Sequence, residues 1–206
     1  MTPEQFAAQA PIHPDSLQDY RIWERLLGKW NARINLVAPD SLSDFWSRHA
    51  LDSAQLIPHI GANCRTLVDF GSGAGFPGIA LAIESKHSQA ERQIHLIESV
   101  GKKASFLKTV SRETVLPTIV HSDRIEKIEP LSADTITARA FAPLHRLLPL
   151  AQRHLNDGGE LLLLKGRGVG REISEVEASW SFDHEQFPSL SHDDGVILRI
   201  ANLALR

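Results

Sequence analysis

The chain has 206 residues, of which 42% are hydrophobic and 23% are charged, and its formal net charge is −3 at pH 7. This composition is typical of a single globular domain, and the slight acidity argues against a non-specific nucleic-acid binder, which is usually basic. The single cysteine, Cys64, excludes a disulfide framework and a cysteine-rich zinc site, and it fits a reducing cytosol.

The sequence shows no pattern that predicts export, a membrane span or a metal site. No basic region followed by an apolar region opens the chain, and no apolar run approaches the roughly 20 residues of a membrane span. The ten histidines are scattered, without a pair at metal-ligand spacing. We therefore expect a cytoplasmic monomer that contacts no membrane and holds no metal.

Residues 1–60 are expected to form an N-terminal helical cap within the same globule as the rest. Apolar residues recur every three or four positions from residue 17 to residue 36, which predicts one amphipathic helix. Trp23 and Trp30 share its apolar stripe, which favours a place in the core over base stacking. A second helix is expected from Pro39.

From residue 65 the pattern changes to strands that alternate with helices. This alternation predicts a parallel sheet with helices on both faces, in a domain covering residues 61–206. Strands are expected over residues 65–70, 93–98, 117–120, 134–138 and 160–164. Helices are expected over 77–85, 102–112 and 144–155, and an antiparallel strand pair over 180–187 and 195–201.

The stretch from Leu67 to Gly78 predicts a strand, a tight glycine loop and a helix. Its glycines allow positive φ and let a ligand approach the backbone. Read as Gly73-x-Gly75-x-x-Gly78, the loop matches a dinucleotide fingerprint. Read as Asp69-x-Gly71-x-Gly73-x-Gly75, it matches the S-adenosylmethionine loop of class I methyltransferases. The second reading is preferred because the strand is expected to end at Phe70, which makes Gly71 the first glycine of the turn.

Candidate ligand-binding residues follow the expected strands, whose carboxyl ends form the binding edge of such sheets. Glu98 ends the second strand, where its carboxylate can accept the ribose hydroxyls of an adenosine cofactor. Ile125 and Glu126 follow the third strand and are expected beside the adenine.

Arg139 and Phe141 end the fourth strand, at the position that decides the reaction class of a methyltransferase. The acid or amide, prolines and aromatic residue of enzymes that methylate amino groups are absent there. Methylation of pyrimidine carbon 5 needs a cysteine nucleophile, and Cys64 precedes the first strand. A ring nitrogen with a lone pair, such as guanine N7, fits better because no general base is needed. Arg139 would then orient the cofactor or the base, and Phe141 would stack on the base. The alternative is that Arg139 is a salt-bridged strand end and Phe141 a core residue.

Two groups of cations are candidates for phosphate contacts. Lys165, Arg167 and Arg171 flank glycines after the fifth strand, and this flexible loop is interpreted as a phosphate clamp. The helix after the second strand carries Lys102, Lys103, Lys108 and Arg112, which are more simply explained as a solvated face.

These motifs together resemble the RsmG (GidB) family of bacterial ribosomal RNA methyltransferases. The resemblance rests on four segments: Asp69 to Gly78, Glu98-Ser99-x-x-Lys102-Lys103, Arg139-Ala140-Phe141-Ala142 and Leu164-Lys165-Gly166. Upstream, Arg48-His49-x-x-Asp52-Ser53 also matches; on physical grounds alone it is interpreted as a salt-bridged brace, with a substrate contact as the alternative. The likeness covers roughly residues 20–170.

The resemblance implies a class I, Rossmann-like methyltransferase that makes N7-methylguanine in 16S ribosomal RNA near the decoding site, on free RNA or on a small-subunit particle. Cofactor contacts are expected from Gly71, Gly73, Phe76, Glu98, Ile125, Glu126 and Arg139, the last also as the catalytic residue. RNA contacts are expected from Arg48, His49, Phe141, Lys165 and Arg167. An NAD-dependent oxidoreductase and a non-catalytic RNA- or nucleotide-binding module remain as alternatives.

Overall fold

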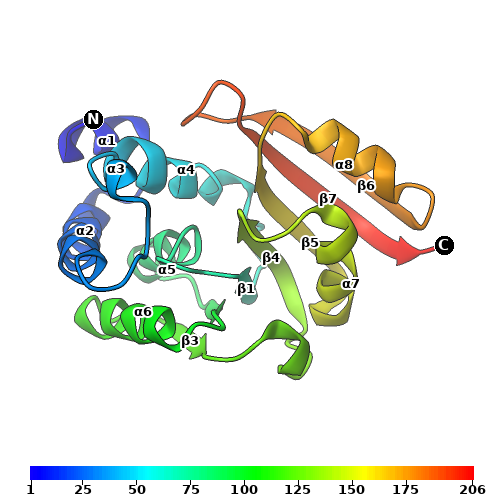
Figure 1. The fold of residues 1–206 in the computed structure, drawn as a ribbon, viewed down its shortest axis with the longest axis horizontal. Helices are drawn as coiled ribbons and strands as arrows, with labels where there is room; N and C mark the ends of the chain where they lie inside the picture. The colour runs from blue at the N-terminus through cyan, green and yellow to red at the C-terminus, as the bar shows by residue number, and fades with distance from the viewer.

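The computed structural model describes residues 1–206, except for the side chain of Pro39. Its centre is a seven-stranded sheet in the order β3-β2-β1-β4-β5-β7-β6 (Figure 1). Five strands run parallel: β1 (Thr66–Phe70), β2 (Gln93–Ile97), β3 (Thr118–His121), β4 (Ala133–Arg139) and β5 (Leu155–Lys165). The last two are β6 (Trp180–Pro188) and β7 (Val196–Leu205), and β7 is antiparallel to both of its neighbours.

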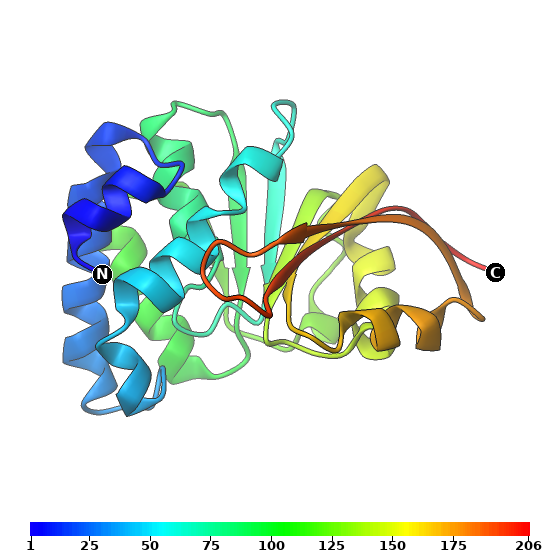
Figure 2. The ribbon, with the colours of Figure 1, turned by 90° about the horizontal axis from the view of Figure 1, so that it is seen from above.

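Helices cover both faces of the sheet, as predicted (Figure 2). One face packs against α5 (Gly78–His87), α6 (Gly101–Glu113) and the N-terminal helices, and the other packs against α7 (Leu144–His154) and α8 (Val169–Val176). Side chains alternate along each strand, so Leu67 of β1 enters the first core and Val68 enters the second. The predicted α/β fold class is confirmed.

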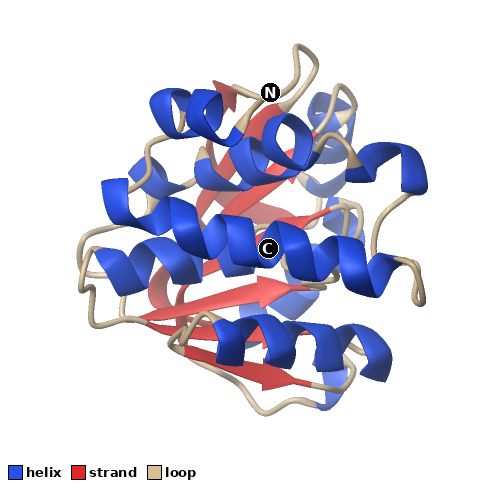
Figure 3. Cartoon of the chain, turned by 90° about the vertical axis from the view of Figure 1, so that its left-hand side faces the viewer, coloured by secondary structure: helices blue, strands red, loops and turns tan.

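The N-terminal residues form helices on the same face of the sheet as α5 and α6, and Figure 3 looks onto this helical side. These are α1 (Pro3–Gln9), α2 (Leu17–Asn31), α3 (Pro39–Leu42), a π-helical segment (Phe45–Ala50) and α4 (Leu51–Ala54), with single 3₁₀ turns at Pro14–Ser16 and Ile57–His59. Trp23 is fully buried and its Nε1 donates to the carbonyl oxygen of Ala74 at 3.1 Å. This contact joins α2 to the glycine loop, and it confirms Trp23 as a core residue.

Helix α2 ends earlier than the apolar pattern predicted. The side-chain oxygen of Asn31 accepts hydrogen bonds from the backbone N–H groups of Leu36 at 2.8 Å and Val37 at 3.0 Å. These bonds satisfy the two backbone N–H groups in a turn instead of a helix. The helix therefore stops at Asn31, although apolar residues continue to recur beyond it.

Two segments near the end of the chain also differ from expectation. The Asn156–Gly159 stretch, predicted as a break before the fifth strand, lies within β5, where Asn156 Nδ2 donates to Asp134 Oδ1 at 2.5 Å. The glycine-rich segment after β5 was predicted as a flexible loop, but α8 begins there at Val169. Val169, Ile173 and Val176 form its buried face. In the described part of the chain, no helix is long and apolar enough to cross a membrane.

Candidate active site

The glycine loop turns sharply at the carboxyl end of β1. The strand ends at Phe70, and Gly71, Gly73 and Gly75 have φ values of 66°, 55° and 100°, a region that residues with a side chain rarely adopt. A Cβ on residue 71 would lie 2.5 Å from Cδ2 of Phe141. All three glycines of the methyltransferase reading are therefore required by backbone angle, and the first and third also by space, since a Cβ on residue 75 would lie 2.5 Å from Cγ1 of Ile79.

Asp69 fastens this loop to the sheet. Its Oδ2 accepts from the backbone N–H of Gly78 at 3.2 Å, and its Oδ1 accepts from Thr137 Oγ1 on β4 at 2.8 Å. Asp69 is fully buried. Burial raises the pKa of its carboxyl group to about 6, although the hydrogen bonds act in the opposite direction. Asp69 thus fixes the start of α5 against β1 and β4, behind the ligand-facing surface.

Glu98 connects the loop to the start of α6. Its Oε2 accepts from the N–H of Gly73 at 2.9 Å, and its Oε1 accepts from the N–H of Val100 at 2.8 Å. The carboxylate borders a cavity of about 290 Å³ whose other lining residues are Gly71, Ile97, Ser99, Asp123, Arg124, Ile125, Glu126 and Phe141. Of the seven predicted cofactor residues, the structure places four around this cavity, namely Gly71, Glu98, Ile125 and Glu126, and Gly73 contacts Glu98. An apolar wall facing a carboxylate suits an adenosine group.

A larger cavity, of about 790 Å³, opens at the ends of β4 and β5. Its lining includes the predicted residues Arg48, Arg139, Phe141, Lys165 and Arg167. Phe141 lines both cavities and is half-buried. The two cavities therefore meet at one aromatic ring, next to the end of the fourth strand, where the sequence predicted the reacting groups.

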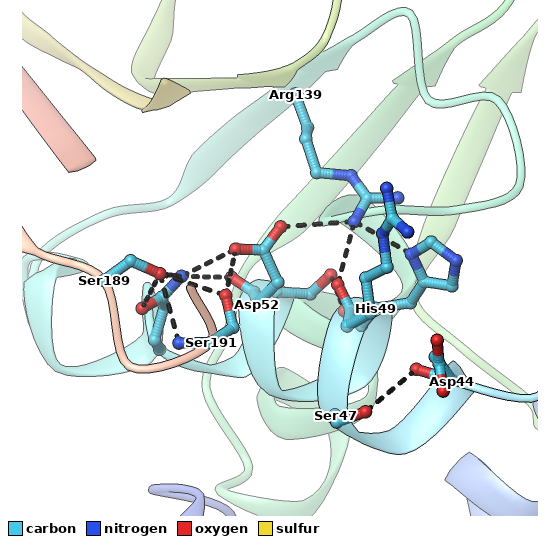
Figure 4. A network of polar contacts seen from close by, with 10 residues as sticks. Asp44, Ser47, His49, Asp52, Arg139, Ser189 and Ser191 are labelled. Carbon is cyan, nitrogen blue, oxygen red and sulfur yellow. Dashed lines mark hydrogen bonds and ion pairs between the residues drawn. The ribbon is translucent and has the colours of Figure 1, made fainter. Parts of the chain in front are cut away.

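Arg139 is held by three partners from the N-terminal helices (Figure 4). Its Nη1 donates to Asp52 Oδ2 at 3.2 Å, to His49 Nδ1 at 3.1 Å and to the carbonyl oxygen of Arg48 at 3.4 Å. The guanidinium carbon lies 4.5 Å from the centroid of the Phe76 ring, a cation–π geometry. Burial lowers the pKa of Arg139, and the charge of Asp52 counteracts this. The predicted brace exists, but its carboxylate pairs with Arg139 of β4.

His49 and Phe76 lie behind Arg139 and line neither cavity. The His49 ring stacks on Phe76 with centroids 4.7 Å apart, and Phe76 is 4% exposed. Burial, followed by the charge of Arg139, lowers the pKa of His49 to about 4, so the ring is neutral at pH 7 and accepts the hydrogen bond from Arg139. His49, predicted to contact RNA, and Phe76, predicted to contact the cofactor, thus both pack against Arg139.

Lys165 and Arg167 are both engaged within the protein. Lys165 Nζ donates to Glu172 Oε2 at 2.7 Å and to the carbonyl oxygen of Ala142 at 3.0 Å. Lys165 therefore ties β5 to α8. The most buried cation of the predicted phosphate clamp is thus paired with a carboxylate of the protein. Arg167 pairs with Asp194 of the β6–β7 loop, while its side chain stays 82% exposed.

Sequence reasoning gave Asp52 a role as a brace or a substrate contact and gave no site role to Glu172 or Ser191, and all three line the larger cavity. Asp52 belonged to the motif that begins at Arg48, so the sequence marked it as a candidate, but nothing in the sequence indicated that its partner is Arg139. Glu172 and Ser191 carried no such signal, because neither belongs to a motif or to an element that the sequence predicted. No group of three or more potential metal-ligating residues occurs among the residues that the structure describes.

Comparisons with known proteins agree with this geometry. The family model described as rRNA small subunit methyltransferase G (GidB) matches residues 16–197. The relative from Paramagnetospirillum magneticum named ribosomal RNA small subunit methyltransferase G is 45% identical over 204 residues, covering 99% of this chain and 97% of the relative. The relative of the same name from Rhodospirillum centenum is also 45% identical, over 98% of this chain and 91% of its own.

The fold matches a solved methyltransferase structure as well. The O-methyltransferase from Bacillus cereus in complex with SAH superposes with a TM-score of 0.63 at 14% identity, covering 96% of each chain. The predicted fold, the family resemblance and S-adenosylmethionine as the cofactor are confirmed, and the nicotinamide reading is not supported. The chain belongs to the rRNA small subunit methyltransferase G (GidB) family.

Proposed function

We propose that this chain transfers a methyl group from S-adenosylmethionine to N7 of a guanine in 16S ribosomal RNA. The observation that carries the proposal is the meeting of two cavities at Phe141, at the carboxyl ends of the strands. The cavity beside Glu98 suits the adenosine of the cofactor, and the larger cavity beside Arg139 suits the acceptor base. Membership of the rRNA small subunit methyltransferase G family supports ribosomal RNA as the substrate.

The cofactor would be held by the residues around the smaller cavity. Glu98 would accept the ribose hydroxyls, since its carboxylate is already oriented by the N–H groups of Gly73 and Val100. Ile125 would pack on the adenine, with Glu126 and the backbone beside its polar edge. Gly71 leaves its backbone open to the ligand. When bound, the cofactor supplies a methyl group on a positively charged sulfur.

Guanine N7 needs no general base, because it carries a lone pair and no proton at neutral pH. That lone pair forms the new N–C bond while the S–C bond breaks, and the positive charge passes to the base without a proton transfer. The only cysteine, Cys64, lies before β1 at the opposite end of the strand, and burial raises the pKa of its thiol. The protein therefore acts by alignment, with Arg139 orienting the reactants and Phe141 stacking on the base.

RNA contacts would come from exposed cations near the larger cavity. Arg48 is exposed at its rim, and Arg167 can exchange Asp194 for a phosphate. The exposed face of α2 carries Arg21, Arg25 and Lys29, spaced four residues or about 6 Å apart, and Arg33 follows in the turn after the helix. A chain of net charge −3 thereby presents a cationic stripe that can follow an RNA backbone.

In this proposal the substrate is free 16S RNA or a small-subunit particle, and the enzyme works as a cytoplasmic monomer. Residues 1–60 serve as the cap that supports Arg139, and residues 61–206 serve as the cofactor-binding domain.

Calorimetric titration with S-adenosylhomocysteine, with NAD as a parallel titrant, tests the assignment of the cofactor site. Micromolar binding of S-adenosylhomocysteine and no heat from NAD is the expected result. Binding of NAD alone would overturn the cofactor assignment and the roles given to Glu98 and Gly71.

A further inference from the structure

We propose that Asp52 is a positioning residue for Arg139, and that the same carboxylate holds the β6–β7 loop as a wall of the acceptor cavity. The inference rests on the proposed function for the identity of the acceptor. It assigns a task to the loop between β6 and β7.

The two oxygens of Asp52 serve two different parts of the chain (Figure 4). Oδ2 accepts from Arg139 Nη1 at 3.2 Å, at the end of β4. Oδ1 accepts from Ser191 Oγ at 2.7 Å, in the β6–β7 loop, and from Gln55 Nε2 at 2.9 Å. One carboxylate on α4 thus connects the arginine of the site to a loop that is distant in the sequence.

Gln55 fastens the same loop at a second point. Its Oε1 accepts from the backbone N–H of Leu190 at 2.7 Å, and its Nε2 donates to Ser189 Oγ at 3.2 Å. Gln55 is 2% exposed, so these bonds are shielded from water. The loop segment 189–195 therefore has a fixed position relative to α4.

This loop borders the larger cavity next to the end of β5, since Val196 at the start of β7 pairs with Lys165. Ser191, His192, Asp194 and Gly195 are among the lining residues, and Asp194 pairs with Arg167. An acceptor nucleotide in the cavity would contact the loop and Arg139 at the same time. Because Asp52 binds both, it sets the distance between the wall and the arginine.

Asp52 is also suited electrostatically to hold Arg139. The other acceptors of the guanidinium are neutral groups, the His49 ring and the Arg48 carbonyl oxygen. The Arg139 and Asp52 side chains are 20% and 18% exposed, so their attraction is weakly screened. The nearby positive charge of Arg48 repels that of Arg139. Without the carboxylate, the guanidinium would be drawn away from the ring of Phe76 and towards solvent.

Two substitutions separate the two halves of this arrangement. Asp52→Asn keeps an oxygen for Ser191 and Gln55 but presents an amide N–H to the guanidinium, so it disrupts only the Arg139 side. Ser191→Ala removes the bond from the loop to Asp52, together with a contact between the Ser189 and Ser191 hydroxyl groups within the loop, and leaves the Arg139 side intact. Asp44→Asn is the matched control, because Asp44 is an exposed acid in the segment just before the π-helical turn.

We expect Asp52→Asn to lower kcat about 100-fold with the KM for RNA changed less than kcat, because Arg139 loses its alignment. Ser191→Ala is expected to keep kcat, to raise the KM for RNA several-fold and to speed hydrogen exchange in residues 189–195. Asp44→Asn should leave all three quantities unchanged. Wild-type kcat in folded Asp52→Asn, or unchanged exchange and KM in Ser191→Ala, would overturn the inference.

The hydrogen-exchange comparison separates this inference from the proposed function. If the wild-type protein transfers no methyl group, the proposed function fails. Faster exchange of 189–195 in Ser191→Ala would still support the role of the carboxylate in holding the loop, and unchanged exchange would reject it.

Discussion

The ring of Phe141 occupies the space in which a side chain on residue 71 would begin. An ideal Cβ on Gly71 would lie 2.5 Å from Cδ2 of Phe141 and 3.3 Å from Cε2. This close contact brings the loop after β1 and the loop after β4 together, and Phe141 lines both the smaller and the larger cavity. The cofactor loop and the acceptor cavity are therefore coupled through one aromatic side chain.

Gly71→Ala should damage both cavities. The methyl group collides with Phe141, and a φ of 66° costs alanine about 1–2 kcal/mol relative to glycine. We expect weaker binding of S-adenosylhomocysteine by calorimetry and a lower midpoint of thermal unfolding. Gly101→Ala is the control, since no atom lies within 4 Å of its added Cβ. Wild-type affinity in the Gly71→Ala variant would show that the contact is not restrictive.

Arg139→Ala should abolish methylation while the fold survives. The side chain contacts Asp52, His49 and Phe76 at the edge of the sheet and is not part of the apolar cores. We expect kcat/KM to fall at least about 100-fold, and Arg139→Lys to recover little of it, because a lysine lacks the planar fork. Arg146→Ala, on the exposed face of α7, is the matched control. Turnover at the wild-type rate by folded Arg139→Ala would remove this residue from the mechanism.

Asp69 predicts a pH dependence of stability. Its folded-state pKa is raised to about 6 from 3.8, so the folded state binds this proton more tightly than the unfolded state does. The stabilisation from the proton is fully present below pH 4 and is lost as the pH rises through 6, by up to about 3 kcal/mol. The free energy of unfolding of the wild type minus that of Asp69→Asn should therefore fall between pH 4 and pH 7. A difference that stays flat across this range contradicts the assignment.

The cationic stripe on α2 predicts the salt dependence of RNA binding. Replacing Arg25, Lys29 and Arg33 by glutamine should make the slope of log K against log[salt] shallower by about 2, since each phosphate contact contributes about 0.7–0.9. The slope is measured by fluorescence anisotropy between 50 and 200 mM salt. Arg65→Gln, before the amino end of β1, is the control and should leave the slope intact. Equal slopes for the triple variant and the wild type would place the RNA elsewhere.

The sheet and its cofactor loop could be predicted because their signals are local. Each buried strand is a short apolar run, and the glycines of the loop mark positions where φ must be positive. Glu98, Ile125 and Glu126 followed from the rule that ligands bind at the carboxyl ends of parallel strands. The structure places all three around one cavity.

The support of the site could not be predicted because its contacts join distant segments. Asp52 and Arg139 are 87 residues apart, and the sequence offered Arg48 as a closer partner for the acid. Helix α8 was missed because three glycines suggested a loop, although Val169, Ile173 and Val176 already had helical spacing. That helix brings Glu172 to Lys165 and so removes a cation from the predicted phosphate clamp.

Mapping the methylated base tests the central claim most directly. The purified protein is incubated with labelled S-adenosylmethionine and either 16S RNA or small-subunit particles from cells that lack the family's enzyme. Reduction and aniline cleavage then locate any N7-methylguanine. The expected result is one methyl group per RNA at the N7 of a single guanine near the decoding site, absent with Arg139→Ala. Transfer to another atom, or no transfer by protein that binds S-adenosylhomocysteine, would contradict the account.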